Sequence, residues 1–272
     1  MTLPAHFFEL FALLMLTGAA GGMLSGLLGI GGGVIFVPAL FYSFQALGMD
    51  ETHTMHLAIG TSLAIVLATS ASSAFHHHKL RAVDIAIVKS WGPFIVLGVV
   101  LGSTLASLVH GHTLKEIFAV LMMLMAVYML LPKKIAGAAR TDLSLFVIQG
   151  ACTVIGMISA MIGSGGAILN VPMMSYTGVP IRRAVATSAA LGLAVALPGM
   201  LGYILSGLAH SAELPPLSLG YISLPAVIVI APMSMLLAPF GVRLSHSLPK
   251  KTLRRIFSVM LILVSLHMFF TL

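Results

Sequence analysis

The chain consists of long apolar runs separated by short gaps, and the gaps hold most of the proline, histidine and charged residues. A helix that crosses a bilayer needs about 20 apolar residues, a length that most of these runs reach or approach. The first run extends from residue 7 past residue 28, and the others lie at 33–47, 54–75, 86–109, 115–131, 143–162, 166–177, 184–206, 217–240 and 253–271. The pattern predicts an all-α, polytopic membrane protein.

The composition excludes an ordinary water-soluble domain, because 59% of the 272 residues are hydrophobic and only 8% are charged. We therefore expect no soluble catalytic domain, no enzyme activity and no cofactor. The net charge of +7 does not indicate nucleic-acid binding, because the basic residues lie in short loops, as they do on the cytoplasmic side of membrane proteins. The single cysteine, Cys152, excludes a disulfide or a cysteine-based metal site within one chain.

Three segments of the first half recur in the same order in the second half. The matched pairs are residues 29–38 with 163–172, residues 58–62 with 184–188, and residues 114–120 with 253–259. One matched glycine run could arise by chance, but three matches in sequence indicate an internal repeat. We therefore divide the single membrane domain into two transmembrane repeats, residues 1–135 and residues 136–272.

The charges at matched loops have opposite signs in the two halves. Asp50 and Glu51 follow the first glycine segment, whereas Arg182 and Arg183 follow the second. Because cytoplasmic loops collect Lys and Arg, matched loops are expected on opposite faces, which makes the repeat inverted. Five transits per half place thirteen of the 14 basic residues on one side, with only Lys115 opposite. This count predicts that both termini are periplasmic in a bacterial inner membrane.

Each half is expected to hold about four spanning helices and one short, broken helix opened by a glycine-rich segment. The short segments are 33–47 and 166–177, and about 15 residues at 1.5 Å each cover only two-thirds of a hydrocarbon core of roughly 30 Å. Their amino ends should therefore lie inside the membrane, where free N–H groups and the helix dipole favour an anion. The alternative is that these glycines only allow close packing of helices.

Neutral polar side chains near these segments complete the predicted anion site. Asn170 stands where the first half has Phe36, so the second half is expected to contribute more to ligand selection. Hydroxyl groups can donate to an oxyanion without the cost of burying a charge, although they can instead bond back to the preceding helical turn. The predicted binding residues are Gly31, Gly32, Gly33, Thr61, Ser62, Ser164, Gly165, Gly166, Asn170, Thr187 and Ser188.

Charged residues are expected only at the edges of this site. Arg182 and Arg183 could gather anions at the cytoplasmic mouth, although the cytoplasmic bias of basic residues explains them equally well. No Asp, Glu, Lys or Arg lies in the middle of an apolar segment, which argues against a carboxylate-based cation site or proton relay.

Two other functions remain open from the residues alone. A transition-metal permease would use the run His76, His77 and His78, since imidazole is a common metal ligand. A membrane scaffold that transports nothing would need no polar cavity at the glycine segments.

The sequence resembles the sulfite exporter TauE/SafE family of bacterial membrane proteins. The resemblance covers nearly the whole chain and is carried by residues 29–33 with Val37 and Pro38, residues 163–166 with Val171 and Pro172, residues 186–188 and residues 253–257. Membership implies a transporter that moves small sulfur oxyanions or organosulfonates, such as sulfite or sulfoacetate, across the bacterial inner membrane, often outward.

Together these arguments predict a secondary transporter that works by alternating access around an anion site near the midplane. An inside-negative potential favours the expulsion of an anion by roughly 2.3 kcal/mol per charge per 100 mV. Export can therefore run uncoupled, whereas uptake needs a co-transported ion, H+ or Na+. The expected partners are the small anion, the lipid bilayer and this coupling ion, and the sequence leaves a homodimer open.

Overall fold

The computed structural model describes residues 7–28, 32–130, 144–244 and 250–270, which fold into ten helices. The helices are α1 (Phe7–Leu28), α2 (Gly33–Ala46), α3 (Glu51–Lys79), α4 (Ile85–Ser107), α5 (Gly111–Leu130), α6 (Leu145–Ile162), α7 (Ala167–Tyr176), α8 (Ile181–Leu208), α9 (Leu224–Leu244) and α10 (Lys250–Phe270). Among the described residues, six of these helices are long and apolar enough to cross a membrane: α3, α4, α5, α6, α8 and α9. The predicted all-α membrane fold is confirmed.

The predicted beginning of one helix is wrong. The apolar run from residue 217 suggested a helix there, but α9 begins only at Leu224. Leu217 and Gly220 have φ angles of 64° and 53°, which a right-handed helix excludes, and Ser218 pairs with Ser223 in an isolated bridge. The apolar residues before α9 therefore form a folded loop.

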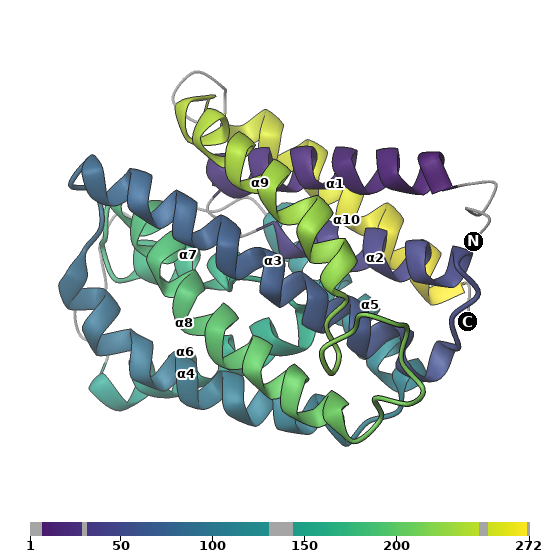
Figure 1. Ribbon diagram of the computed structural model, residues 1–272. Helices are drawn as coiled ribbons and strands as arrows, with labels where there is room; N and C mark the ends of the chain where they lie inside the picture. The colour runs from purple at the N-terminus through teal and green to yellow at the C-terminus, as the bar shows by residue number, and fades with distance from the viewer. Residues whose placement is uncertain (1–6, 29–31, 131–143, 245–249, 271–272) are drawn as a thin grey trace.

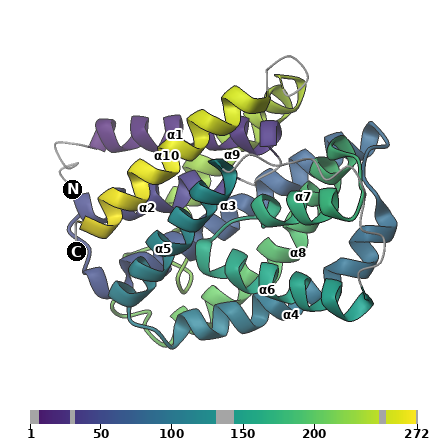
Figure 2. The same cartoon turned by 180° about the vertical axis from the view of Figure 1, so that it is seen from behind.

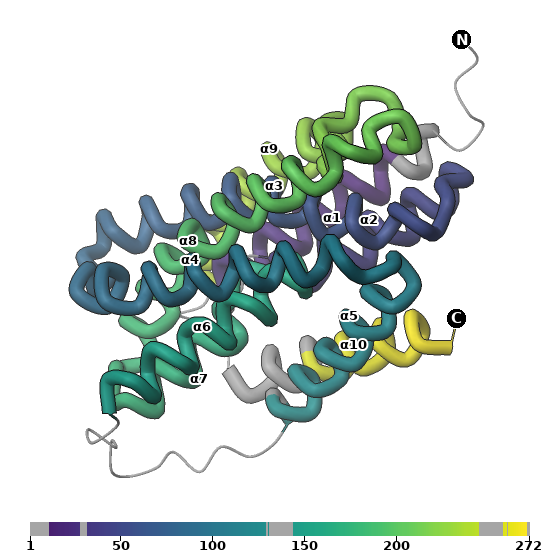
Figure 3. The backbone as a smooth tube through the Cα atoms, turned by 90° about the horizontal axis from the view of Figure 1, so that it is seen from below, coloured from purple at the N-terminus to yellow at the C-terminus, as the bar shows by residue number. Residues whose placement is uncertain are grey.

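The long helices are arranged in pairs. α1 packs against α9 on one side of the molecule and α4 packs against α6 on the opposite side, with α3 and α8 between them (Figure 1). α5 and α10 form a further pair behind them, as the reverse view shows (Figure 2). Seen from below, this pair lies apart from α4 and α8 (Figure 3). Each of these pairs joins one helix from the first half of the chain to one from the second half.

Glycines bring the backbones of two helix pairs into direct contact. A Cβ atom placed on Gly26 of α1 would overlap the carbonyl oxygen of Ala238 of α9. A Cβ atom on Gly98 of α4 would likewise overlap the carbonyl oxygen of Thr153 of α6. Small residues at helix interfaces allow this approach in membranes, where apolar burial alone does not hold helices together.

α3 is the central helix of the fold. It packs against α2, α8 and α9, and its residues Leu57, Ile59 and Leu63 are fully buried. The outer surface carries large exposed apolar side chains such as Leu205 and Ile228, as expected for helices that face lipid. α3 thus contacts the short helix α2 directly, and it also contacts α8, against which the short helix α7 packs. The polar residues of α3 therefore lie at the centre of the molecule.

Candidate functional site

The two short helices begin in the same unusual way. The residues before their first turns, Gly32 and Gly166, both have a φ of 74°, a left-handed conformation that favours glycine. Neither residue provides a side-chain cap, and Pro38 and Pro172 stand at the same position within each helix. Both helices therefore begin with N–H groups that no side chain caps, as the repeated sequence predicts.

The glycine segments of the two halves meet in the interior of the protein. A Cβ atom on Gly33 would overlap the carbonyl oxygen of Gly163 and would lie 2.8 Å from the Cα atom of Ser164. All three residues are buried. We call this contact between residues 32–33 and residues 163–166 the glycine crossing. Gly31 lies outside the described residues.

Ser62 of α3 binds the backbone of the glycine crossing. Its hydroxyl group donates to the carbonyl oxygen of Gly163 over 2.8 Å, and its oxygen lies 3.5 Å from the carbonyl oxygen of Gly33. The hydroxyl thus holds the two halves together. Ser188, the matched residue of α8, is also fully buried, but its hydroxyl group has no hydrogen-bond partner.

The matched serines should therefore respond differently to alanine. Ser62→Ala leaves the buried Gly163 carbonyl without its donor, and we expect the free energy of unfolding to fall by about 1–3 kcal/mol. Ser188→Ala removes a hydroxyl group that forms no bond, so we expect no loss of stability without ligand. Thermal unfolding of the two purified variants in detergent measures both effects. Equal destabilisation would contradict the predicted difference.

Asn170 is a buried polar residue beside the crossing whose side-chain amide forms no hydrogen bond. It lies one turn into α7 and is fully buried, yet neither its Nδ2 nor its Oδ1 atom forms a hydrogen bond. A Cβ atom on Gly166 would lie 3.1 Å from the Nδ2 atom, so the amide lies beside the uncapped end of α7. Unbonded buried amides are rare and costly. The amide and the N–H groups of α7 could together bind an anion.

The two predicted threonines have structural partners instead. The hydroxyl oxygen of Thr61 accepts a hydrogen bond from the N–H group of Ser223, and that of Thr187 accepts one from the N–H group of Asp84, each over 2.9 Å. These bonds fix the starts of α9 and α4. Neither of these two hydrogen bonds goes to the preceding helical turn, which was the alternative that the sequence left open. The structure does not place Thr187 at the glycine crossing.

The remaining predicted residues surround this centre or lie far from it. Ser164 is buried, and the carbonyl oxygen of Gly165 would lie 3.6 Å from a Cβ atom on Gly192 of α8. Arg182 and Arg183 are exposed at the start of α8, where Nη2 of Arg183 lies 3.9 Å from Oδ2 of Asp84. These arginines therefore lie at one end of the molecule, beside the start of α4.

The histidine run does not converge on one point. His77 is buried, His78 is exposed, and His76 bonds through Nδ1 to the carbonyl oxygen of Ser72. Consecutive residues of a helix face different directions. Within the described ranges, no group of three His, Cys, Asp or Glu side chains could hold a metal ion. The geometry therefore gives the metal-permease alternative no site at these histidines.

A second group of histidines, which the sequence did not reveal, lies at the other end of the molecule. His53 and His56 of α3 line one cavity with His110, His210 and Tyr221, which come from distant parts of the sequence. The order of the membrane crossings could have indicated this grouping from the sequence. A count of five transits per half places the start of α3, the end of α4 and the end of α8 on the same side.

The chain is similar to probable membrane transporters over almost its whole length. The family described as "Sulfite exporter TauE/SafE" matches residues 14–268. A "Probable membrane transporter protein" of Haemophilus influenzae is 36% identical over 265 residues, which cover 96% of this chain and 99% of that protein. A protein of Methanocaldococcus jannaschii with the same description is 27% identical, with 98% of each chain covered. No solved structure matches the chain with significance.

These relatives agree with the architecture of a multi-pass membrane protein. A third relative, from Bacillus subtilis, is also described as a "Probable membrane transporter protein" and is 24% identical over 96% of this chain and 97% of its own. The relatives are described as transporters, which points to a protein that is not an enzyme. The chain is a membrane protein of the sulfite exporter TauE/SafE family.

Proposed function

We propose that the protein is a secondary transporter that exports small sulfur oxyanions or organosulfonates across the bacterial inner membrane. The observation that carries the proposal is the buried amide of Asn170, which has no hydrogen-bond partner and lies beside the uncapped end of α7. In this proposal the anion completes the bonds that the amide and the helix end lack.

The chemistry of the site suits a weakly held anion. The Nδ2 atom of Asn170 can donate to a sulfonate or sulfite oxygen, while the first N–H groups of α7 and the helix dipole stabilise the negative charge. The polar side chains in and beside the crossing, Ser62, Ser164 and Asn170, are neutral. Neutral donors allow the anion to leave, which a transporter requires as much as binding.

The arrangement of the helices supports two inverted repeats, residues 1–135 and 136–272. α1 with α9 and α4 with α6 are the pairs expected if a twofold axis exchanges the two halves. The start of α3, which carries His53, lies beside the loop after α8, which carries Glu213. The start of α8, which carries Arg183, lies beside the start of α4, which Asp84 caps. We assign the arginine end to the cytoplasm, which places both termini in the periplasm and permits alternating access.

Thermal unfolding of the purified protein with sulfite, sulfoacetate, sulfate, chloride or nickel tests the proposal. A ligand that binds only the folded protein at 100 times its Kd stabilises it by about 2.7 kcal/mol. We expect stabilisation by sulfite or sulfoacetate, little by chloride, and loss of the effect in Asn170→Ala. The matched control, Phe36→Leu, should lower stability but keep the response.

Three results would count against this function. The first is stabilisation by nickel alone, the second is equal stabilisation by chloride and sulfite, and the third is an unchanged response in Asn170→Ala. Each would show that this site does not selectively bind a sulfur anion. Flux of labelled sulfite out of proteoliposomes then separates a transporter from a protein that only binds the anion.

A further inference from the structure

A cavity of 390 Å³ opens at the end of the molecule where α3 begins, away from the glycine crossing. Its polar walls come from α3, from the connection between α4 and α5, and from the loop between α8 and α9. The titratable side chains that line it are His53, His56, His110, His210, Glu213 and Tyr221. Neither the proposed anion site nor the family resemblance uses these residues.

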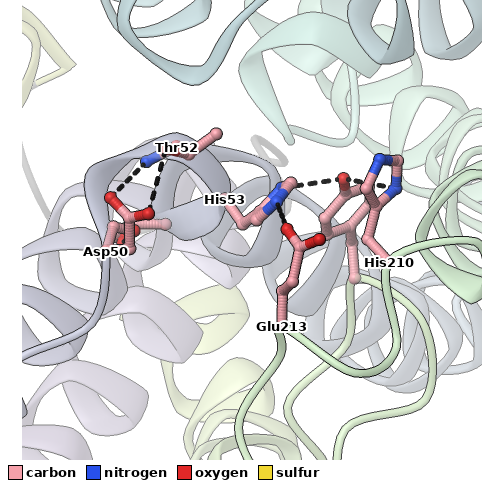
Figure 4. A network of polar contacts seen from close by, with 7 residues as sticks. Asp50, Thr52, His53, His210 and Glu213 are labelled. Carbon is pink, nitrogen blue, oxygen red and sulfur yellow. Dashed lines mark hydrogen bonds and ion pairs between the residues drawn. The ribbon is translucent and has the colours of Figure 1, made fainter.

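Four of these side chains form a continuous hydrogen-bonded chain. Oε2 of Glu213 lies 2.7 Å from Nε2 of His53, and the hydroxyl oxygen of Tyr221 lies 3.0 Å from Nδ1 of the same histidine (Figure 4). The Tyr221 hydroxyl oxygen also lies 3.3 Å from Nδ1 of His210. We call Glu213, His53, Tyr221 and His210 the proton chain.

The proton chain has two complete hydrogen-bonding arrangements that differ by one proton. When both histidines are neutral, His210 donates to Tyr221, Tyr221 donates to His53, and His53 donates to Glu213. When a proton enters at Nε2 of His210, His210 passes its Nδ1 proton to Tyr221, and Tyr221 passes its own proton to Nδ1 of His53. His53 is then charged and donates to both neighbours, while Tyr221 donates to Nδ1 of His210, which has become an acceptor. Each contact is satisfied in both arrangements, so the chain can accept a proton without leaving a group unbonded.

Tyr221 can relay a proton between the two histidines because its hydroxyl group stays protonated. Burial, and secondarily the negative charge of Glu213, raises the pKa of Tyr221 above its usual value. The phenol therefore remains a donor throughout the range in which histidines ordinarily titrate, pH 5 to 8. The ring is also held in place, because it stacks on the ring of His56 with centroids 5.0 Å apart.

Some of the other polar groups near His53 have local partners. Nε2 of His56 bonds to the carbonyl oxygen of Ala106, although its buried Nδ1 atom has no hydrogen-bond partner, and Asp50 caps the first turn of α3. Three further titratable groups lie on the neighbouring elements. Glu51 is bonded to Gln45, and His112 lies 3.9 Å from Glu116. His110 lines the cavity wall. Glu213 is the acid that contacts His53 among the described residues, with Oε2 2.7 Å from Nε2.

The proton chain is joined to the glycine crossing by α3. A Cβ atom on Gly60 would overlap the carbonyl oxygen of Tyr221, and Thr61 accepts the hydrogen bond from Ser223 of the same loop. The next residue, Ser62, binds the crossing. Nine residues of helix separate His53 from Ser62, a rise of about 13 Å. A change of charge at His53 is therefore expected to act on α3, the helix whose Ser62 binds the glycine crossing beside the anion site.

We infer that the proton chain is a proton-binding site at the outer mouth of the transporter, and that its occupancy promotes passage of the anion. The inference rests on the proposed function, because it names the ion that regulates the same transport. A bound proton adds one positive charge to the cavity, which favours an anion in the mouth, and loss of the proton leaves the carboxylate of Glu213 to repel it.

Exchange of labelled sulfoacetate in proteoliposomes with equal pH on both sides tests the inference. The sulfonate and the carboxylate of this anion are both ionised from pH 6 to pH 8, so any pH dependence belongs to the protein. We expect exchange in the unchanged protein to be about tenfold faster at pH 6 than at pH 8, since an ordinary histidine loses its proton over this range.

Variants identify the residues responsible. His53→Gln and Glu213→Gln should each abolish the pH dependence, and Tyr221→Phe should do so while keeping the packed ring. The control, His112→Gln, changes an exposed histidine at the same end and should keep the pH dependence. Wild-type exchange that is equal at pH 6 and pH 8, or a pH dependence retained in both His53→Gln and Tyr221→Phe, would overturn the inference.

A second measurement separates this inference from the proposed function. NMR of the protein labelled with ¹⁵N-histidine reports the titration of each ring without any transported anion. We expect His53 and His210 to titrate as a coupled pair that Tyr221→Phe uncouples. Coupled titration without any anion exchange would overturn the proposed function alone, whereas independent titration with normal exchange would overturn the proton site alone.

Discussion

Gly33→Ala should strongly destabilise the folded transporter. The added Cβ atom would overlap the carbonyl oxygen of Gly163 and would lie 2.8 Å from the Cα atom of Ser164. These neighbours are backbone atoms, so no side chain can rotate to make room. Overpacking of a core costs about 1–3 kcal/mol and sometimes more, and we expect the upper end here because two halves of the fold must separate. Thermal unfolding and size-exclusion chromatography in detergent measure the loss.

The control for this variant is Gly150→Ala in α6. A Cβ atom on Gly150 meets nothing within 4 Å, and alanine favours a helix interior over glycine by up to about 1 kcal/mol. We expect this variant to be at least as stable as the unchanged protein. If Gly33→Ala unfolds at the same temperature as Gly150→Ala, the direct contact of the two glycine segments is wrong.

Asn170→Leu should make the protein more stable while it removes the response to the anion. The buried amide has two unbonded polar atoms, and replacing it with an apolar side chain of similar size removes a desolvation cost of about 1–3 kcal/mol. A residue kept only for stability would show the opposite effect. Thermal unfolding without ligand and with sulfite, together with sulfite flux in proteoliposomes, measures both consequences.

Thr69→Val is the matched control, because Thr69 is a buried polar residue whose bonds are satisfied. Its hydroxyl group bonds to the carbonyl oxygen of Ile65 and to Oγ of Ser234. We expect valine at this position to lower the free energy of unfolding by about 1 kcal/mol and to leave the anion response intact. Lower stability of Asn170→Leu, with a retained response, would show that the amide serves the fold instead of the ligand.

Periodicity and repetition predicted most of the fold because membrane helices depend on length and apolar content alone. The short helices α2 and α7 were predicted from glycine runs, since only glycine readily adopts the left-handed conformation of Gly32 and Gly166. The start of α9 could not be predicted, because the residues before it are as apolar as a helix and their turn depends on contacts with α8.

The sequence predicted which residue types gather at the centre but not which atoms they bind. Ser62 and Ser188 are matched residues, yet only one finds a carbonyl oxygen within reach. Thr61 binds the N–H group of Ser223, 162 residues later, and no local pattern reveals such a partner. The proton chain escaped prediction for the same reason, since its members come from α3 and from the loop after α8.

The glycine contacts along α1 with α9 and along α4 with α6 restrict how the molecule can change shape. Where backbone touches backbone, as at Gly26 and Gly98, neither helix can slide or rotate without a collision, so each pair should move as one rigid body. α3 and α8 meet through side chains instead, with Leu63 beside Gly199 and Ser70 beside Gly192. The hinge that exposes Asn170 to one side or the other is therefore expected along this softer contact.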